Sequence, residues 1–226
     1  MGLNISKGNM YEFITHTWNT VKGECFHDCS YCYMKRWGKL NPVRFDVKEL
    51  RTDLGTGNFI FVGSSCDMFA ENIPSEWILR TLLKCSDYHN SYLYQTKNPA
   101  RIIPFIDALP IFSNHCVTIE TNRSYPEIMR NCPSPRQRVN DLIALNEATI
   151  NTCYITIEPL MDFDLEEFLN MLELCEPKQV NIGADSGKNN LPEPTKDKVI
   201  SLIEGLEKFT TIHNKSNLRR LLEAVA

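Results

Sequence analysis

The sequence predicts an α/β fold with a parallel sheet. Short runs rich in Val, Ile, Thr and aromatic residues alternate with segments of helical periodicity, about six times along the 226 residues. Right-handed βαβ units produce this alternation, and the strands are mostly apolar, as expected when both faces of a sheet are covered. Periodicity alone does not distinguish an open doubly wound sheet from a barrel.

Each expected strand ends at a polar or turn residue. The six strands are predicted at 13–19, 59–64, 91–97, 115–121, 153–159 and 179–185. In parallel α/β folds the functional residues lie at the carboxyl ends of the strands. We therefore expect the site to be built from the polar residues that end them, which are Asn19, Gly63, Ser64, Ser65, Thr96, Lys97, Glu120, Thr121, Asn122, Glu158, Gly183, Ala184 and Asp185.

Five helices are expected between and after these strands, at 74–85, 98–109, 134–148, 162–175 and 194–209. Pro74 with Ser75, and Asn98 with Pro99, are typical of helix starts. Arg136 and Arg138 open the third helix, where we expect both on a solvated face, with binding of a carboxylate or phosphate as the alternative. Cys85 and Cys175 occupy helix positions typical of small core residues.

The composition describes an ordinary globular protein. With 42% hydrophobic and 23% charged residues, a substantial core can form, and we read residues 1–226 as one domain. The net charge of −4 does not favour a polyanion partner in bulk, although a local basic groove remains open. The first residues do not resemble a signal peptide, and no apolar run reaches the ~20 residues of a membrane span. We expect a cytoplasmic protein without membrane contact, with reduced thiols.

The run "GECFHDCSYCYM" (23–34) places Cys25, Cys29 and Cys32 in a C-x3-C-x2-C pattern just beyond the first strand. The flanking residues are polar, which suits a loop wrapped around a metal. A structural zinc site needs four ligands, and His27 is the candidate fourth, but ligands at alternating positions would crowd a tetrahedron. A [4Fe–4S] cluster fits better, because three cysteines bind three irons and leave the fourth open to a ligand.

With Tyr31 directly before the third cysteine, this motif resembles the radical S-adenosylmethionine (radical SAM) superfamily. The resemblance implies a partial (β/α)6 barrel with parallel strands and covers most of the chain. "THTWNTVKGECFHDCSYCYM", "FVGSSCDMF", "QTKNPARI", "ITIEPL" and "IGADSG" are similar to a phage-associated radical SAM family of unsettled function. The spore photoproduct lyase branch looks like a more distant relative.

The resemblance implies the chemistry of the site. In such enzymes three thiolates, here those of Cys25, Cys29 and Cys32, hold a [4Fe–4S] cluster, and S-adenosylmethionine chelates the open iron. An electron from a donor such as flavodoxin or ferredoxin cleaves S-adenosylmethionine to methionine and a 5′-deoxyadenosyl radical, which removes a hydrogen atom from the substrate. The substrate class stays open between a nucleotide or nucleic acid and a peptide.

The remaining cofactor-binding candidates follow from the same resemblance. The family's glycine-rich turn, which binds the methionine amino group, falls on Gly63-Ser64-Ser65; no Glu is present there, so Asp67 or backbone carbonyls would serve. The other cofactor-binding candidates are Tyr31, Glu120, Asn122 and Gly183. The candidate catalytic residues, chosen by their position at the strand ends, are Cys66, Lys97 and Glu158; Cys66 follows residues 63–65 at the mouth of the second strand and is the candidate hydrogen-atom donor.

Structural roles remain open for several of these residues. Glu120 and Glu158 are also typical of strand-end carboxylates that pair with Lys97 or Arg123. Residues 63–65 are also typical of a simple turn, and Cys66 is also typical of a small packed residue. The alternative function is a non-catalytic zinc- or iron–sulfur-binding protein on the same α/β scaffold.

Overall fold

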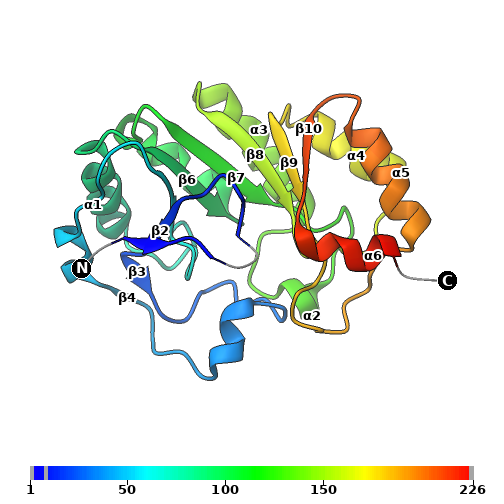
Figure 1. Ribbon diagram of the computed structural model, residues 1–226, viewed down its shortest axis with the longest axis horizontal. Helices are drawn as coiled ribbons and strands as arrows, with labels where there is room; N and C mark the ends of the chain where they lie inside the picture. The colour runs from blue at the N-terminus through cyan, green and yellow to red at the C-terminus, as the bar shows by residue number, and fades with distance from the viewer. Residues whose placement is uncertain (1–2, 8–9, 224–226) are drawn as a thin grey trace.

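The computed structural model describes residues 3–7 and 10–223. An 8-stranded sheet runs through it in the order β1-β2-β5-β6-β7-β8-β9-β10 (Figure 1). All neighbours from β2 to β10 are parallel, and β1 (Asn4–Ile5) adds an antiparallel edge to β2 (His16–Trp18). The other strands are β5 (Phe59–Val62), β6 (Ser91–Thr96), β7 (Ser113–Thr118), β8 (Thr152–Ile157), β9 (Gln179–Ile182) and β10 (Thr211–Asn214).

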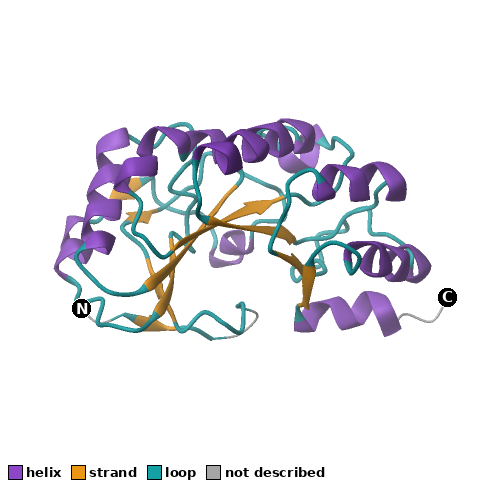
Figure 2. Cartoon of the chain, turned by 90° about the horizontal axis from the view of Figure 1, so that it is seen from above, coloured by secondary structure: helices purple, strands orange, loops and turns teal. Residues whose placement is uncertain are grey.

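The sheet is curved but does not close. The edge strands β1 and β10 do not pair, so the fold is a partial barrel, as predicted. Figure 2 shows most of the helices along the outer side of the curved sheet, whereas the concave side holds mainly loops and one short helix. The α-helices are α1 (Ser75–Ser86), α2 (Pro126–Met129), α3 (Pro135–Ala148), α4 (Leu165–Glu173), α5 (Lys196–Leu206) and α6 (Arg219–Glu223).

All six expected strands are present, and β10 is an additional parallel strand. The sequence predicts no strand at residues 211–214, because they lack an apolar run; in the structure these residues are exposed or half-buried. They pair with β9 over four residue pairs, from Thr211↔Gln179 to Asn214↔Ile182. The missed strand matters, because the segment that follows it contributes Lys215 to the site.

The expected helix at 98–109 is wrong. The chain forms two 3-10 helices there, η3 (Pro99–Arg101) and η4 (Ile103–Ala108). Pro104 lies in the middle of this segment, where its ring clashes with the preceding turn and no N–H is available for an α-helical bond. By contrast, the helices α3 and α5 begin as expected, because the side chains of Ser134 and Thr195 accept hydrogen bonds from backbone N–H groups of the first turn.

Side chains alternate between two cores along the strands. Ile60 and Val62 of β5 belong to the larger core, which includes the buried faces of the helices, whereas Phe61 points to a second cluster with Tyr11 and Leu93. Residues 10–14 run across the second cluster, and the Tyr11 hydroxyl donates a hydrogen bond of 2.8 Å to the Gln95 side chain. The N-terminal segment therefore fills part of the concave side of the open barrel.

The carboxyl ends of the parallel strands meet at one edge of the sheet. A 2-stranded ribbon, β3 (Val21–Lys22) with β4 (Arg44–Phe45), lies beside this edge, and the chain between its strands carries the cysteine motif and the 3-10 helix η1 (Tyr33–Trp37). A further 3-10 helix, η2 (Val47–Arg51), follows β4, and η5 (Ser216–Leu218) follows β10. Within the described residues, no helix is long and apolar enough to cross a membrane.

Candidate active site

The cysteine loop leaves the sheet through a glycine turn. Gly23 has φ +111°, and a Cβ there would lie 2.6 Å from the Pro42 carbonyl oxygen, so only glycine fits without strain. The next residue, Glu24, donates its N–H to the Asn41 carbonyl at 2.8 Å. These contacts tie the start of the loop to the chain that returns into β4.

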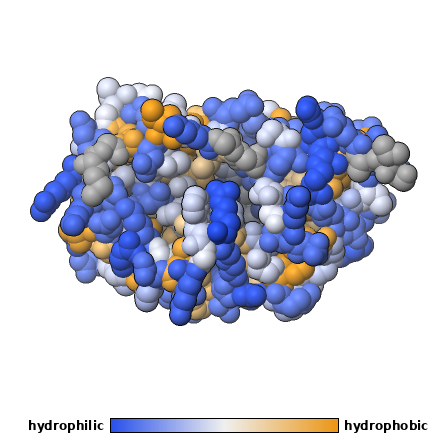
Figure 3. Space-filling view, turned by 60° about the horizontal axis from the view of Figure 1, so that its bottom comes forward, coloured by the Kyte–Doolittle hydropathy of each residue, from blue (hydrophilic) through white to orange (hydrophobic). Residues whose placement is uncertain are grey.

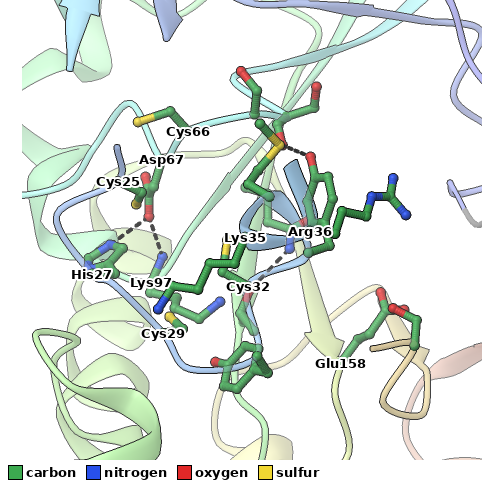
Figure 4. A pocket seen from close by; sticks show the side chains of 18 of the residues that line it. Cys25, His27, Cys29, Cys32, Lys35, Arg36, Cys66, Asp67, Lys97 and Glu158 are labelled. Atoms are coloured by element: carbon green, nitrogen blue, oxygen red, sulfur yellow. Dashed lines mark hydrogen bonds and ion pairs between the residues drawn. The ribbon is translucent and has the colours of Figure 1, made fainter. Parts of the chain in front are cut away.

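Cys25, Cys29 and Cys32 all line one cavity of about 600 Å³ at the carboxyl edge of the sheet (Figure 4). Two tight turns bring them there, because Asp28 donates its N–H to the Cys25 carbonyl and Cys32 to the Cys29 carbonyl, each at 3.2 Å. Cys29 is buried and the other two are half-buried. The spacing therefore directs three thiols into the same space.

Two of these thiols ionise easily. A hydrogen bond from Cys66 lowers the pKa of Cys25 to about 7, and one from Cys132 lowers the pKa of Cys29 to about 6. The sulfurs of Cys29 and Cys132 lie 3.4 Å apart. Burial raises the pKa of Cys32. Because the thiolate is the metal ligand, Cys25 and Cys29 are prepared for ligation near neutral pH.

The chemistry of the donors fits an iron–sulfur cluster, which is held by thiolates. In residues 3–7 and 10–223, no three Cys, His, Asp or Glu side chains are placed to bind one metal ion together. The ligands of a cubane stand further apart than those of a mononuclear site, because each thiolate binds a different iron. Three thiols facing one cavity, beside the cation of Lys97, fit that requirement.

The Nε2 of His27 is not available as a fourth ligand in this arrangement, whereas its buried Nδ1 has no hydrogen-bond partner among the described residues. Its Nε2 is hydrogen-bonded at 2.8 Å to Asp67, which also accepts from the Thr96 hydroxyl and the Lys97 N–H, both at 2.9 Å, while the other Asp67 oxygen accepts from the Phe69 N–H. Burial opposes the His27 charge, but the bond to Asp67 raises its pKa. Asp67 lines the cavity, yet it mainly joins the cysteine loop to β6.

A buried charge network lies beneath the cysteine loop. Glu120 and Arg138 are fully buried, with Arg138 Nη1 2.6 Å from Glu120 Oε2, and the Lys97 Nζ lies 3.6 Å from Glu120 Oε1. Tyr31 donates its hydroxyl to Glu120, and the Lys97 ammonium lies 5.5 Å from the centre of the Tyr31 ring. Burial alone would raise the pKa of Glu120, but Arg138 and Lys97 lower it.

The turn after β5 forms one wall of the cavity. Gly63 has φ +83°, and the side chain of Asn19 holds the next two residues by accepting the Ser65 N–H at 2.9 Å and bonding the Ser64 hydroxyl at 3.2 Å. Cys66 follows, 3% exposed, and its hydrogen bond with Cys25, together with burial, raises its pKa far above that of a free thiol. The Cys66 sulfur therefore keeps its proton.

The opposite wall comes from the ends of β8, β9 and β10. Glu158 follows β8, and its carboxylate lies 2.6 Å from Lys215 Nζ and 3.0 Å from Asn217 Nδ2. The Lys215 ammonium also lies 4.6 Å from the centre of the Tyr11 ring. Gly183 leaves room for this carboxylate, because a Cβ there would lie 2.9 Å from Glu158 Oε1.

Most of the residues predicted from the sequence line this cavity. They are Cys25, Cys29, Tyr31, Cys32, Gly63, Ser64, Ser65, Cys66, Asp67, Lys97 and Glu158. Glu120, Asn122 and Gly183 lie outside its lining: Glu120 is beneath Tyr31, Gly183 backs Glu158, and Asn122 bonds Glu167 at 2.8 Å on α4. Their assignment to cofactor binding stays a prediction.

Arg138 was expected on a solvated face, and that expectation is wrong. The residue is fully buried against Glu120, whereas Arg136, two positions earlier, is exposed and pairs with Glu167. Lys215 and Cys132 were also missed, since each is distant in sequence from the motif that it joins. The cation nearest to Glu120 in the sequence, Arg123, pairs instead with Asp162 and Asp164.

Comparisons with known proteins find matches to the structure but not to the sequence. No family model and no curated protein matches the sequence, so the likeness to the phage-associated family stays a prediction. Spore photoproduct lyase complexed with dinucleoside spore photoproduct matches with a TM-score of 0.69 and 9% identity, over 93% of this chain and 80% of the other. A double mutant of the same lyase, with bound AdoMet and dinucleoside spore photoproduct, matches with a TM-score of 0.68 and 9% identity, over the same 93% and 80%.

A second type of protein shares the fold. Streptococcus suis SuiB bound to S-adenosylmethionine matches with a TM-score of 0.56 and 10% identity, over 88% of this chain and 50% of the other. At these identities the matches establish a common fold. The fold predicted from the cysteine motif and the strand pattern is therefore the fold found by comparison.

Proposed function

We propose that this protein is a radical SAM enzyme. The observation that carries the proposal is the position of Cys25, Cys29 and Cys32, whose C-x3-C-x2-C loop faces one cavity at the carboxyl edge of a partial barrel. The fold shared with spore photoproduct lyase and SuiB supports it, because structures of both contain S-adenosylmethionine.

Cys25, Cys29 and Cys32 would hold a [4Fe–4S] cluster, with S-adenosylmethionine beside it. Together these groups supply one-electron reduction and a carbon radical that removes a hydrogen atom from an unreactive C–H bond. Lys97 lies where it offsets thiolate charge, since burial lowers its pKa but the Coulombic attraction of Cys29 and Glu120 raises it. The cation therefore remains charged next to the loop.

The walls of the cavity would position the cofactor. The turn at 63–65 presents backbone groups and two hydroxyls, and Glu158 on the opposite wall presents a carboxylate beside Lys215. A carboxylate and an ammonium placed together complement the amino and carboxylate groups of an amino acid moiety. An external donor of the flavodoxin or ferredoxin class would supply the electron.

Cys66 would complete the reaction by returning a hydrogen atom to the substrate. It lines the cavity, is protonated, and forms a hydrogen bond with Cys25, one of the three motif cysteines. The S–H bond is weaker than most C–H bonds, so a thiol in this position can donate a hydrogen atom to a carbon radical. Once a substrate is known, Cys66→Ala should retain iron and S-adenosylmethionine cleavage while altering or stalling the product; an unchanged product formed at an unchanged rate would exclude the role.

The proposed function is tested by metal content and cofactor cleavage. Anaerobically purified protein should be brown, contain about four irons, and release 5′-deoxyadenosine from S-adenosylmethionine after reduction with dithionite. Cys29→Ala should lose the iron and the release, and Cys175→Ala, a buried cysteine outside the cavity, should keep both. Colourless protein with one zinc, or a Cys29→Ala variant that still cleaves the cofactor, would contradict the proposal.

A further inference from the structure

The segment that follows the third cysteine, "YMKRWGKL" (33–40), forms a rim at the mouth of the cavity. Met34, Lys35, Arg36 and Lys39 are among its lining residues. Two aromatic side chains on the same segment remain open to solvent, Tyr33 at 45% and Trp37 at 69% exposure. We call residues 33–39 the aromatic–basic rim. Figure 3 brings this end of the molecule forward and shows hydrophilic side chains over most of that face.

Arg36 is held between the two rings rather than by an acid. Its guanidinium carbon lies 5.6 Å from the centre of the Tyr33 ring and 5.2 Å from that of Trp37. No carboxylate within the described residues forms an ion pair with Arg36 or Lys39, whereas Lys35 pairs with Asp28 at 2.7 Å. The rim therefore presents two cations whose hydrogen-bond donors are free for a ligand.

The acids around the cavity do not neutralise these cations. Asp28 is taken by Lys35, Asp67 by His27, and Glu158 by Lys215. Two lining acids remain: Asp185 accepts hydrogen bonds from the N–H groups of residues 187 and 189, at 2.9 and 2.5 Å, and Glu24 forms no ion pair within the described residues. The rim itself, with three cations and no acid in residues 33–39, is thus locally basic, although the whole chain has a net charge of −4.

We propose that the aromatic–basic rim binds a single-stranded nucleic acid and that this strand carries the substrate nucleotide; the second part rests on the proposed function. Arg36 and Lys39 contact phosphates, which guanidinium and ammonium groups bind well, and the exposed face of Trp37 stacks on a base. An unpaired strand is favoured over a duplex, because stacked bases have no free face for Trp37 and reach a cavity only after they are flipped out of the helix.

The binding experiment uses anaerobically purified protein and a fluorescein-labelled single strand of about 12 nucleotides, within the range of known single-strand site sizes. Fluorescence anisotropy is measured between about 50 and 200 mM salt. The double variant R36Q/K39Q should reduce the slope of log K against log salt by about 1.4, the value for two phosphate contacts on a single strand. A fully paired duplex of the same sequence should bind more weakly than the single strand.

The matched control is K178Q/K208Q, which removes the same charge from exposed lysines at the opposite end of the strands, before β9 and β10. It should leave the salt slope unchanged. Trp37→Ala should weaken binding roughly 5- to 150-fold through loss of stacking, and Trp37→Tyr should restore most of it. Equal effects of the two double variants, or no effect of Trp37→Ala, would overturn the rim as the binding site.

An acidic peptide is the competing occupant, because its carboxylates also pair with Arg36 and Lys39. Displacement of the labelled strand by a poly-glutamate peptide at lower concentration than by unlabelled strand would overturn the proposal in favour of a peptide. Release of 5′-deoxyadenosine is recorded separately. Cofactor cleavage without oligonucleotide binding refutes the rim inference alone, and oligonucleotide binding without iron or cleavage refutes the proposed function alone.

Discussion

Glu120 and Glu158 follow neighbouring strands of the sheet, yet the structure uses them differently. Glu120, two residues beyond β7, is fully buried and contacts Arg138, Lys97 and Tyr31. Glu158 directly follows β8, retains 20% exposure of its side chain, and faces the cavity beside Lys215. A carboxylate at a strand end is thus either a support for the site or part of its wall.

The difference comes from what packs over each strand end. The α3 helix places Arg138 against Glu120, and the cysteine loop covers that pair with Tyr31. The end of β8 is open to the cavity, and its cation arrives only from the segment after β10. Removing one partner of a buried ion pair strongly destabilises the protein, because the other charge stays buried. A carboxylate that faces a cavity tolerates substitution better and remains accessible to ligands.

The largest expected effect is that of Glu120→Ala on folding stability. The change leaves the Arg138 cation buried without its partner, which costs about 3–5 kcal/mol of the free energy of unfolding. Urea denaturation followed by circular dichroism measures it, with Glu167→Ala on the exposed surface as the control. A loss below about 1 kcal/mol would show that Arg138 finds another partner or that the site is hydrated.

The same ion pair predicts a pH dependence. Arg138 and Lys97 depress the pKa of Glu120, so its stabilisation is fully present above the unfolded value of about 4.3 and is lost as the pH falls through the lower folded pKa. The stability difference between the wild type and Glu120→Gln should therefore be largest near neutral pH and shrink below about pH 4. A difference that stays constant through the acid range contradicts this assignment.

A smaller, functional effect is expected from Glu158→Ala. If Glu158 binds the cofactor, loss of one charge-assisted hydrogen bond costs about 1.5–3 kcal/mol, which corresponds to roughly 10- to 150-fold weaker binding of S-adenosylmethionine. Iron content should not change, because Glu158 lies on the wall opposite the cysteines. Calorimetric titration of the anaerobic protein measures the affinity, and unchanged binding would make Glu158 only a partner of Lys215.

The smallest effect is expected from Arg136→Ala. Arg136 lies two residues before Arg138 on α3, but its side chain is 67% exposed and pairs with Glu167 at the surface. Exposed ion pairs contribute about 0–1 kcal/mol to stability. Urea denaturation should show a much larger loss in the free energy of unfolding for Arg138→Ala than for Arg136→Ala. Equal losses for the two variants would contradict the different roles inferred from their burial.

The sequence by itself determined the features that depend on near neighbours. The apolar strand runs, the capped helices such as α3, and the spacing of Cys25, Cys29 and Cys32 are local, so the parallel α/β fold and the edge that carries the motif could be predicted, whereas the partial barrel was implied by the resemblance of the motif. The one failed helix, at 98–109, also had a local cause in Pro104, which the periodicity of the surrounding apolar residues obscured.

Only the tertiary structure decided which residues meet. Arg138 and Glu120 are 18 positions apart, Cys29 and Cys132 are 103 apart, and Lys215 and Glu158 are 57 apart. Local pattern cannot show such pairs, because burial and charge pairing depend on where the chain returns to the sheet. An arginine that opens a helix is typical of a solvated face in sequence, but the buried carboxylate of Glu120 beneath Tyr31 requires a cation, and the fold supplies Arg138.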